Sequence, residues 1–194
     1  MIALTDNISI IKGGDNPLSS DIAIIKDDDY TILFDVGNNE EYLNLFPNKY
    51  DVIISHFHKD HIGNFNLCNF ENAYVSKETY KHTKKGTIVE TKLSINNILI
   101  FNMPSNHSKG SLCLKYKEYL LVGDCLYGKG EDDRVIYNIQ FLKSQIDILK
   151  KLDVTYVLRG HSMDKLEDIN DAIKQLEDIY SKRTKNDNFI TIKY

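Results

Sequence analysis

The first part of the chain alternates short hydrophobic runs with turn signals. The runs are rich in β-branched and aromatic residues, and clusters of Gly, Pro, Asp and Asn separate them, a pattern typical of β-strands. It predicts strands at residues 8–11, 21–26 and 30–37. The continuous apolar run "YDVIIS", residues 50–55, predicts a strand that is buried on both faces.

The middle of the chain continues with strands and short helices. Strands are predicted at residues 73–76, 86–91, 97–105, 111–116 and 119–125, the last two forming a hairpin through Lys117 and Glu118. Helices are predicted at residues 38–46, 62–70 and 77–83. Glu40 and Glu41 favour the first of these helices, because acidic side chains stabilise the positive end of a helix.

The last part of the chain is dominated by helical periodicity. Apolar residues recur along one stripe between Asn138 and Leu152, and again between Met163 and Lys182. Residues 154–160 predict a buried strand between these helices, and residues 188–194 a strand-like tail. We therefore expect an α/β (α+β) fold with sheets covered by helices, in a single domain over residues 1–194.

Composition narrows the class of protein. The chain has 194 residues, of which 42% are hydrophobic and 27% charged, as is usual for a globular domain. The formal charge of −4 disfavours a nucleic-acid partner. The N-terminus lacks a signal-peptide pattern, no segment has the ~18 apolar residues of a membrane span, and the three cysteines form no CxxC pair. We expect a cytoplasmic protein without a membrane partner.

The segment "SHFHKDHIGN", residues 55–64, concentrates the candidate chemistry. It contains His56, His58, Asp60 and His61 directly after a predicted strand. Neutral imidazoles and carboxylates are common ligands of Zn²⁺ and similar ions. A polar loop or a pH-sensitive histidine cluster is the alternative, but charged imidazoles so close together would repel one another.

Three further side chains occupy comparable places. His107, Asp124 and His161 each lie at or just beyond the end of a predicted strand. Strand ends are where α/β sheets usually present functional groups. Any one of these residues alone is more typical of a turn or the surface, but together with the first segment they indicate a metal site.

Five segments in this order resemble the metallo-β-lactamase superfamily, in its binuclear hydrolase branch. The segments are "TILFDVGNN", "IISHFHKDHIGN" with the His-x-His-x-Asp-His motif, "HSKGSL", "LLVGDCLY" and "YVLRGHS". The resemblance covers nearly the whole chain. It implies a four-layer αββα sandwich, in which helices flank two mixed β-sheets.

The resemblance also implies a ligand set for two divalent metal ions. His56, His58 and His107 would hold one ion. Asp60, His61 and His161 would hold the other, and Asp124 would bridge both. Zinc is the expected metal, with Mn²⁺ or Fe²⁺ as alternatives. Asp60 and Asp124 are the expected catalytic residues, and Asp35 would orient a ligand histidine; a plain turn aspartate is the alternative for Asp35.

The implied reaction is hydrolysis of a small ester, thioester or lactone by a metal-bridging hydroxide. The β-lactamases of the superfamily carry cysteine in place of Asp124, and the diiron electron-transfer relatives carry glutamate in place of His58. Both branches are therefore disfavoured. Asn64, Asn106 and Lys109 depart from residues that are frequent in the family, which leaves the substrate open.

Residues outside the ligand set have weaker indications. Tyr127, Lys129 and Arg134 follow the bridging aspartate and are candidates for substrate binding, with an exposed polar loop as the alternative. Cys125 is expected to pack in the interior, and His82 to face solvent from a helix.

Alternative functions remain open at this level. They are a small-molecule phosphodiesterase, a mono-iron persulfide dioxygenase and a non-catalytic metal-binding scaffold. The segment after His161 predicts one helix and a short tail, so we do not expect the glutathione-binding helical domain of glyoxalase II. We expect a small-molecule substrate; its identity, the native metal and the oligomeric state stay undetermined.

Overall fold

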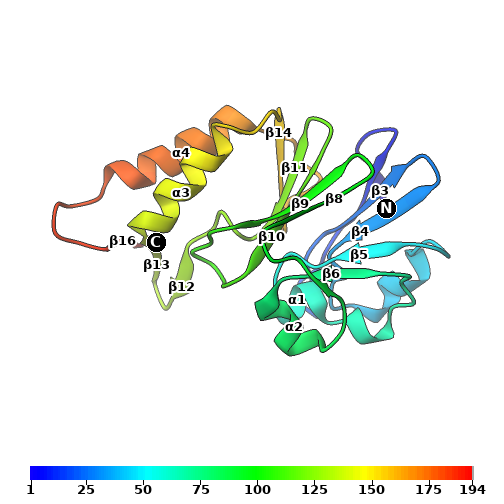
Figure 1. Cartoon of the computed structure of the whole chain (residues 1–194). Coiled ribbons are helices and arrows are strands. Elements are labelled where there is room, and N and C mark those ends of the chain that lie inside the picture. The colour runs from blue at the N-terminus through cyan, green and yellow to red at the C-terminus, as the bar shows by residue number, and fades with distance from the viewer. Residues whose placement is uncertain (194) are drawn as a thin grey trace.

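Two large β-sheets stack face to face and carry helices on their outer faces (Figure 1). The computed structural model describes residues 1–193; Tyr194, the last residue of the predicted tail, lies outside the described range. The four-layer αββα sandwich expected from the sequence is confirmed.

The first sheet has seven strands in the order β1-β2-β3-β4-β5-β6-β7. Its strands pair antiparallel up to β4 and parallel from β4 to β7, so the sheet is mixed. The strands are β1 (Ile2–Ala3), β2 (Ile8–Ile11), β3 (Ile22–Asp27), β4 (Tyr30–Phe34), β5 (Asp51–Ile53), β6 (Ala73–Val75) and β7 (Thr87–Ile88).

The second sheet has six strands in the order β15-β14-β11-β10-β9-β8. All its pairs are antiparallel except β11 with β14, and β10 and β11 form the predicted hairpin. The strands are β8 (Lys92–Ile95), β9 (Ile98–Met103), β10 (Ser111–Tyr116), β11 (Tyr119–Gly123), β14 (Tyr156–Arg159) and β15 (Glu167–Asp168).

Alternation of side chains along the strands explains the layers. In β3, Ala23 and Ile25 lie in the core between the sheets, whereas Ile22 and Ile24 face the helices on the other side. On the first sheet that outer layer contains η1 (Glu40–Leu45), α1 (Lys59–Ile62), η2 (Phe65–Leu67) and α2 (Lys77–Thr83). On the second sheet it contains α3 (Ile139–Leu149) and α4 (Ile169–Ser181).

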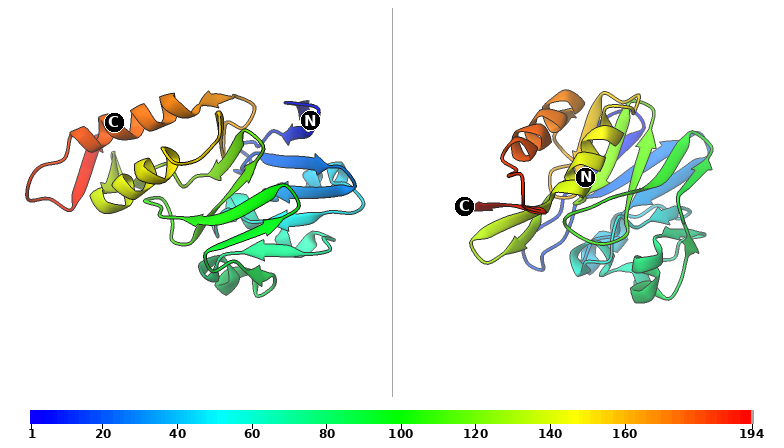
Figure 2. Two further views of the ribbon diagram at one scale, coloured as in Figure 1. Left: turned by 45° about the horizontal axis from the view of Figure 1, so that its top comes forward. Right: turned by 60° about the vertical axis from the view of Figure 1, so that its left-hand side comes forward.

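A third, three-stranded sheet was not predicted from the sequence. It consists of β12 (Lys129–Glu131), β13 (Arg134–Asn138) and β16 (Phe189–Lys193) in the order β12-β13-β16. Figure 2 shows it beside α3 and α4, on the side away from the first sheet. Tyr137 and Ile190 anchor it in the core under these helices. The strand-like tail is therefore correct, but much of residues 126–138, where no strand was predicted, is a β-hairpin.

The predicted helix from Met163 to Lys182 is wrong in its first turn and a half. Met163 is fully buried in the core between the two sheets, and Glu167 and Asp168 form the edge strand β15. The helix begins at Ile169, where the Asp168 side chain accepts a hydrogen bond from the backbone N–H of Asn170. The spacing of Met163 and Leu166 matched the helix by coincidence.

Several shorter elements also differ from the expectation. The helix expected at residues 38–46 is the 3₁₀ helix η1. Within the helix expected at residues 62–70, only Ile62, the last residue of α1, and residues 65–67, the 3₁₀ helix η2, are helical. Strand β8 and the short strand β1 were not predicted. Among the described residues, no helix combines the length and apolar character needed to cross a membrane.

Candidate metal centre

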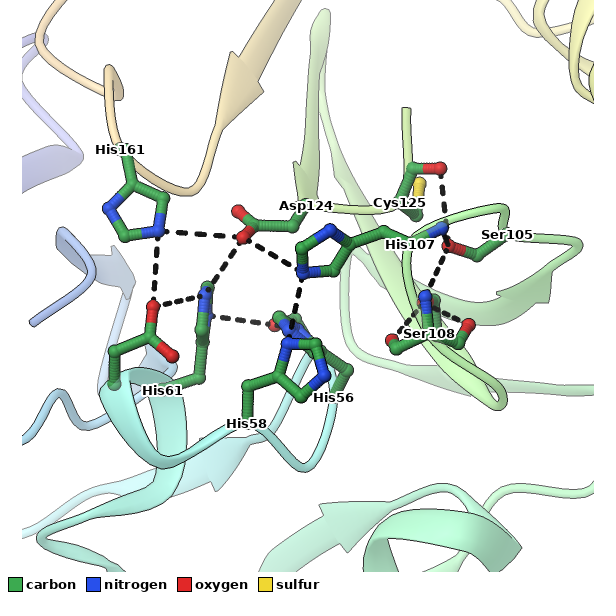
Figure 3. A network of polar contacts seen from close by, with 12 residues as sticks. His56, His58, His61, Ser105, His107, Ser108, Asp124, Cys125 and His161 are labelled. Atoms are coloured by element: carbon green, nitrogen blue, oxygen red, sulfur yellow. Dashed lines mark hydrogen bonds and ion pairs between the residues drawn. The ribbon is translucent and has the colours of Figure 1, made fainter. Parts of the chain in front are cut away.

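Four loops from both sheets converge at one edge of the sandwich (Figure 3). The segment after β5 carries His56 and His58 and runs into α1, which holds Asp60 and His61. The β9–β10 loop carries His107. Asp124 directly follows β11, and His161 lies two residues after β14. The structure thus brings together all seven residues expected to bind metal.

These side chains form two groups. One contains His56, His58 and His107, and the other contains Asp60, His61, Asp124 and His161. Within each group, one ligand atom from every residue lies within 4.8 Å of all the others. The division matches the two metal positions that the motifs implied, with Asp124 grouped among the residues of the second position.

Asp124 links the groups. Its Oδ2 atom lies 3.4 Å from Nε2 of His107 in the first group. The same atom lies 3.4 Å from Nε2 of both His61 and His161 in the second group. A single carboxylate oxygen therefore faces both groups (Figure 3).

Asp60 completes the second group from the opposite side. Its Oδ2 atom lies 3.2 Å from Nε2 of His161 and 3.3 Å from Nε2 of His61. His61 is fully buried, whereas 35% of the His161 side chain is exposed. The second group is thus closed around His61 and open to solvent at His161.

The first group consists of imidazoles alone. Nδ1 of His58 lies 2.9 Å from Nε2 of His107, and the rings of both lie against the ring of His56. In the metal-free cluster, burial and neighbouring imidazoles lower the pKa of His56 to about 2, and burial also lowers the pKa of His58 and His107. All three are therefore neutral near pH 7, which is the form that binds metal.

In the second group, by contrast, the pKa values of the histidines are raised. Hydrogen bonds to Asp124 and Asp60 raise the pKa of His161 to about 9. Burial opposes a charge on His61, but nearby carboxylates, Asp35 foremost, raise its pKa well above the ordinary value. Burial likewise disfavours ionised Asp60 and Asp124, yet the two histidines hold the pKa of both carboxyls below their usual range. Without metal, protons on the imidazoles balance the carboxylates; a divalent cation could take that place.

Asp35 has the orienting position expected for it. The residue is fully buried and adopts a left-handed backbone conformation with φ of 64°. Its Oδ2 atom lies 2.8 Å from Nδ1 of His61, which leaves Nε2 of that ring facing the cluster. The carboxylate also accepts hydrogen bonds from the Ser55 backbone N–H, at 2.7 Å, and from the Ser55 hydroxyl, at 2.8 Å. A strained backbone at such a site is typical of a functional constraint.

Unsatisfied polar atoms test whether metal fits these residues. Nε2 of His56, Nε2 of His61 and Oδ1 of Asp124 are buried and have no hydrogen-bond partner. For His61 the neighbouring carboxylate oxygens are close, but without hydrogen-bond geometry. Buried groups of this kind are normally paired, and imidazole nitrogen with carboxylate oxygen is a donor set that suits Zn²⁺. The residues fit a divalent cation.

Gly160 permits the close packing of the second group. A Cβ atom at this position would lie 2.4 Å from Oδ1 of Asp124 and 2.9 Å from Cε1 of His61. Any larger residue would therefore displace a proposed metal ligand. The backbone N–H of Gly160 also donates to Gly123, the residue before Asp124, at 2.8 Å.

The residues that depart from the family pattern have local roles. Asn64 is buried, and its side-chain amide donates to the carbonyls of Val36 and Asn39, which ties the histidine segment to the loop after β4. The Asn106 side-chain oxygen accepts from the backbone N–H of Asn138, at the start of α3. Lys109 is exposed.

Of the three expected substrate residues, Tyr127 lies at the cluster. Its ring centroid is 6.5 Å from that of His107, and the Arg159 guanidinium lies 5.4 Å from the Tyr127 ring. Lys129 and Arg134 lie in the β12–β13 hairpin and pair with Glu131. Lys129 also borders a cavity of about 160 Å³ beside the loop that carries His107.

Several residues near the cluster were missed by the sequence analysis. Ser105 accepts hydrogen bonds from the backbone N–H groups of His107 and Ser108, at 3.2 and 3.3 Å, and donates to the carbonyl of Cys125 (Figure 3). The amide of Gln145, on α3, donates to the same carbonyl and to that of Pro104. Serine and glutamine are common everywhere, so only their partners reveal this role.

Two other expectations are confirmed. Cys125 is buried, with its sulfur 3.5 Å from that of Cys113 and 3.6 Å from that of Met103. His82 is exposed on α2, where its ring stacks on Phe57 with the centroids 4.5 Å apart.

Sequence comparison leaves this chain without matches: no family model fits it, and no curated protein sequence matches it. Solved structures do match. DIM-1 metallo-β-lactamase superposes with a TM-score of 0.73 at 16% identity, covering 93% of this chain and 95% of that one.

Two further structures extend the comparison. A metallo-β-lactamase superfamily protein from Sulfolobus tokodaii gives a TM-score of 0.63 at 14% identity, covering 95% of this chain and 90% of that chain. ETHE1 from Myxococcus xanthus gives 0.65 at 14% identity, covering 91% and 85%. These likenesses establish the metallo-β-lactamase fold over almost the whole chain, and the resemblance seen in the motifs is confirmed at that level.

Proposed function

We propose that this chain, which has the metallo-β-lactamase fold, is a metal-dependent hydrolase that binds two divalent ions and cleaves a small ester, thioester or lactone. The observation that carries the proposal is the position of Asp124, whose Oδ2 atom lies 3.4 Å from a histidine of the first group and from two histidines of the second. A carboxylate that faces both groups is what a pair of ions needs from a shared ligand.

The ligands divide as the two groups do. His56, His58 and His107 would hold the first ion, and Asp60, His61 and His161 the second, with Asp124 between them. Zinc is the expected metal because the donors are imidazole nitrogens and carboxylate oxygens. Mn²⁺ and Fe²⁺ accept the same donors and are the alternatives.

The bound ions would lower the pKa of a water and polarise the carbonyl of the substrate. The chain's own residues supply the rest. Asp60 and Asp124 present Oδ2 atoms inside the cluster, where either can accept a proton from the attacking water. Asp35 holds His61 in one orientation through its Nδ1 atom.

Substrate binding is assigned to the open side of the cluster. Tyr127 lies beside His107, and its hydroxyl is a candidate for contacting a polar group of the substrate. Lys129 offers a cation next to the same loop, and Arg134 offers another farther along the hairpin. The three free cysteines and the charge of −4 suit a small-molecule enzyme of a reducing compartment such as the cytoplasm.

The test is turnover by zinc-reconstituted protein on a panel containing an aryl ester, a thioester, a lactone and a phosphodiester. His82→Ala is the matched control, because it removes an exposed histidine outside the cluster. We expect ester, thioester or lactone hydrolysis that survives in His82→Ala and is lost in Asp124→Asn. Phosphodiester cleavage alone would replace the proposed substrate class, and failure on the whole panel with both ions bound would favour a non-catalytic scaffold.

A further inference from the structure

The loop between β2 and β3 contacts the two chain segments that carry Asp60 and His161, two residues of the second group. The backbone N–H of Ser20 donates to the carbonyl of Asp60 at 2.9 Å. The next N–H, of Asp21, donates to the carbonyl of Gly160 at 2.8 Å, one residue before His161. Two consecutive residues thus tie α1 to the turn after β14.

The Asp21 side chain extends this contact. It is 1% exposed, and its carboxylate accepts hydrogen bonds from the backbone N–H of Gly13 at 2.7 Å and of Met163 at 2.8 Å. Lys12 donates to the same carboxylate at 2.9 Å. His161 therefore lies between two residues, Gly160 and Met163, whose backbones are both bound by Asp21.

Lys12 reaches His161 itself. Its ammonium donates to the carbonyl of His161 at 3.1 Å and to the carboxylate of Asp164 at 2.6 Å, in addition to Asp21. These are charge-assisted hydrogen bonds, which are stronger than neutral ones. One cation thus joins the strand end at β2 to the backbone of a proposed metal ligand.

The turn from Gly160 to Leu166 contains no helix or strand. Its conformation depends on side-chain contacts of this kind, because a turn without a regular ladder has few backbone bonds of its own. Asp21 and Lys12 supply several of those contacts, and the N–H groups of Ser20 and Asp21 fix the distance to Asp60. None of these hydrogen bonds reaches a residue of the first group: His56 and His58 precede α1, and His107 lies in the β9–β10 loop.

We infer that Lys12 and Asp21 form a clamp that positions His161 for the second ion, together with the backbone N–H of Ser20, which holds Asp60. The inference rests on the proposed binuclear centre, and it assigns Lys12 and Asp21 a role that no sequence motif indicates. They are positioning residues: the contacts described join them to the backbones around the ligands and to Asp164. Loss of either side chain should weaken binding of the second ion and leave binding of the first ion unchanged.

The experiment compares Asp21→Asn with a matched variant, Asp27→Asn. Asp27 is the last residue of β3, as Asp21 is the residue before its first, and it is also a buried carboxylate, bonded to Asn97 and Tyr116. Zinc is titrated into each metal-free protein against a competing chelator, and the Co²⁺-substituted proteins are examined by their visible absorption. Melting of the metal-free proteins reports the structural cost of each change.

We expect Asp21→Asn to bind the first ion as the wild type does and the second about 10- to 100-fold more weakly, the usual effect of removing a residue that supports a ligand. Asp27→Asn should bind both ions with wild-type affinity even if it melts earlier. Lys12→Met should also weaken binding of the second ion, and Lys12→Arg should bind this ion more tightly than Lys12→Met does.

The outcomes separate this inference from the proposed function. If the wild type binds two ions and Asp21→Asn binds both as tightly, the clamp is wrong and the binuclear centre stands. If the wild type binds no second ion, the proposed function fails and the clamp with it. If Asp21→Asn does not fold, Lys12→Met decides, because Lys12 is 42% exposed and its loss leaves no buried cavity; unchanged affinity for the second ion in that variant would overturn the inference.

Discussion

The two halves of the cluster are stabilised in different ways. The first group contains three imidazoles whose pKa values are lowered, and it is neutral. The second contains two carboxylates and two histidines of raised pKa, and buried carboxylates outside the group support it. A neutral group can be held by loop backbone and hydroxyls, whereas a charged, buried group needs charged partners around it.

This difference predicts where each half is sensitive. Asp35 and the Lys12–Asp21 clamp support the second group, and Ser105 supports the loop of the first. Asp124 is common to both. Substitutions at these positions should therefore change the binding of the two ions to different extents.

Asp124→Ala should have the largest effect. The substitution removes the oxygen that faces His61, His107 and His161, and with it a ligand of either ion. We expect the protein to lose at least one bound zinc and hydrolysis to fall by more than ~10²-fold, since metal ions contribute several kcal/mol to transition-state stabilisation. Metal content and kcat/KM measure it; an Asp124→Ala protein with two ions and full activity would show that the halves are independent.

Asp35→Asn should affect the second half and the fold together. The amide cannot accept from Ser55 and His61 as the carboxylate does, so a buried bond is lost or reversed. We expect the free energy of unfolding of the metal-free protein to fall by about 1–3 kcal/mol, and affinity for the second ion to fall about 10- to 100-fold. Denaturant unfolding and zinc titration are the measurements. The Ser55 hydroxyl also lies 3.0 Å from Nδ1 of His56, so binding of the first ion should weaken too, but less. Greater weakening of the first ion than of the second would contradict this assignment of Asp35.

Gly160→Ala should also disturb the second group, through a steric clash, and with a smaller effect than Asp35→Asn. The added methyl would lie 2.4 Å from Oδ1 of Asp124, so the turn or the carboxylate must move. Overpacking of this kind costs about 1–3 kcal/mol. The Co²⁺ absorption of the second ion should shift while that of the first stays closer to wild type. An unchanged spectrum would mean that the turn accommodates the methyl without moving Asp124.

Ser105→Ala should have the smallest effect and act on the first half. The substitution removes the part-buried hydrogen bonds that the Ser105 hydroxyl accepts from the N–H groups of His107 and Ser108. It removes no metal ligand. We expect a loss of about 1 kcal/mol in the free energy of unfolding, with zinc affinity reduced for the first ion more than for the second. Greater weakening of the second ion would reverse the assignment of Ser105.

Much of this arrangement could be predicted from the sequence. Apolar runs predict the strands β5, β9, β11 and β14, and the ligands lie just beyond their ends, so the motifs placed seven side chains that the fold brings together. The helical stripe predicted α3 within a few residues. These features are local, because the hydrophobic period, the length of an apolar run and the residue that follows the run can all be read from one segment.

The remainder depends on contacts that are distant in sequence. Asp21 and Met163 are 142 residues apart, and no local pattern links them. Met163 reads as the first apolar residue of a helix, yet it belongs to the core between the sheets. Strand β12 consists of Lys129, Gly130 and Glu131, whose composition indicates a loop; it forms a strand because β13 pairs with it and β16 covers the other edge of β13.

The central claim is that seven side chains hold two ions, and counting the metal tests it most directly. Protein purified without an affinity tag and reconstituted with zinc would be analysed for metal per chain by elemental analysis. The account predicts two zinc ions per chain. The claim would be contradicted by a chain that retains no zinc after reconstitution, or by one that holds a single iron as purified and does not bind a second ion.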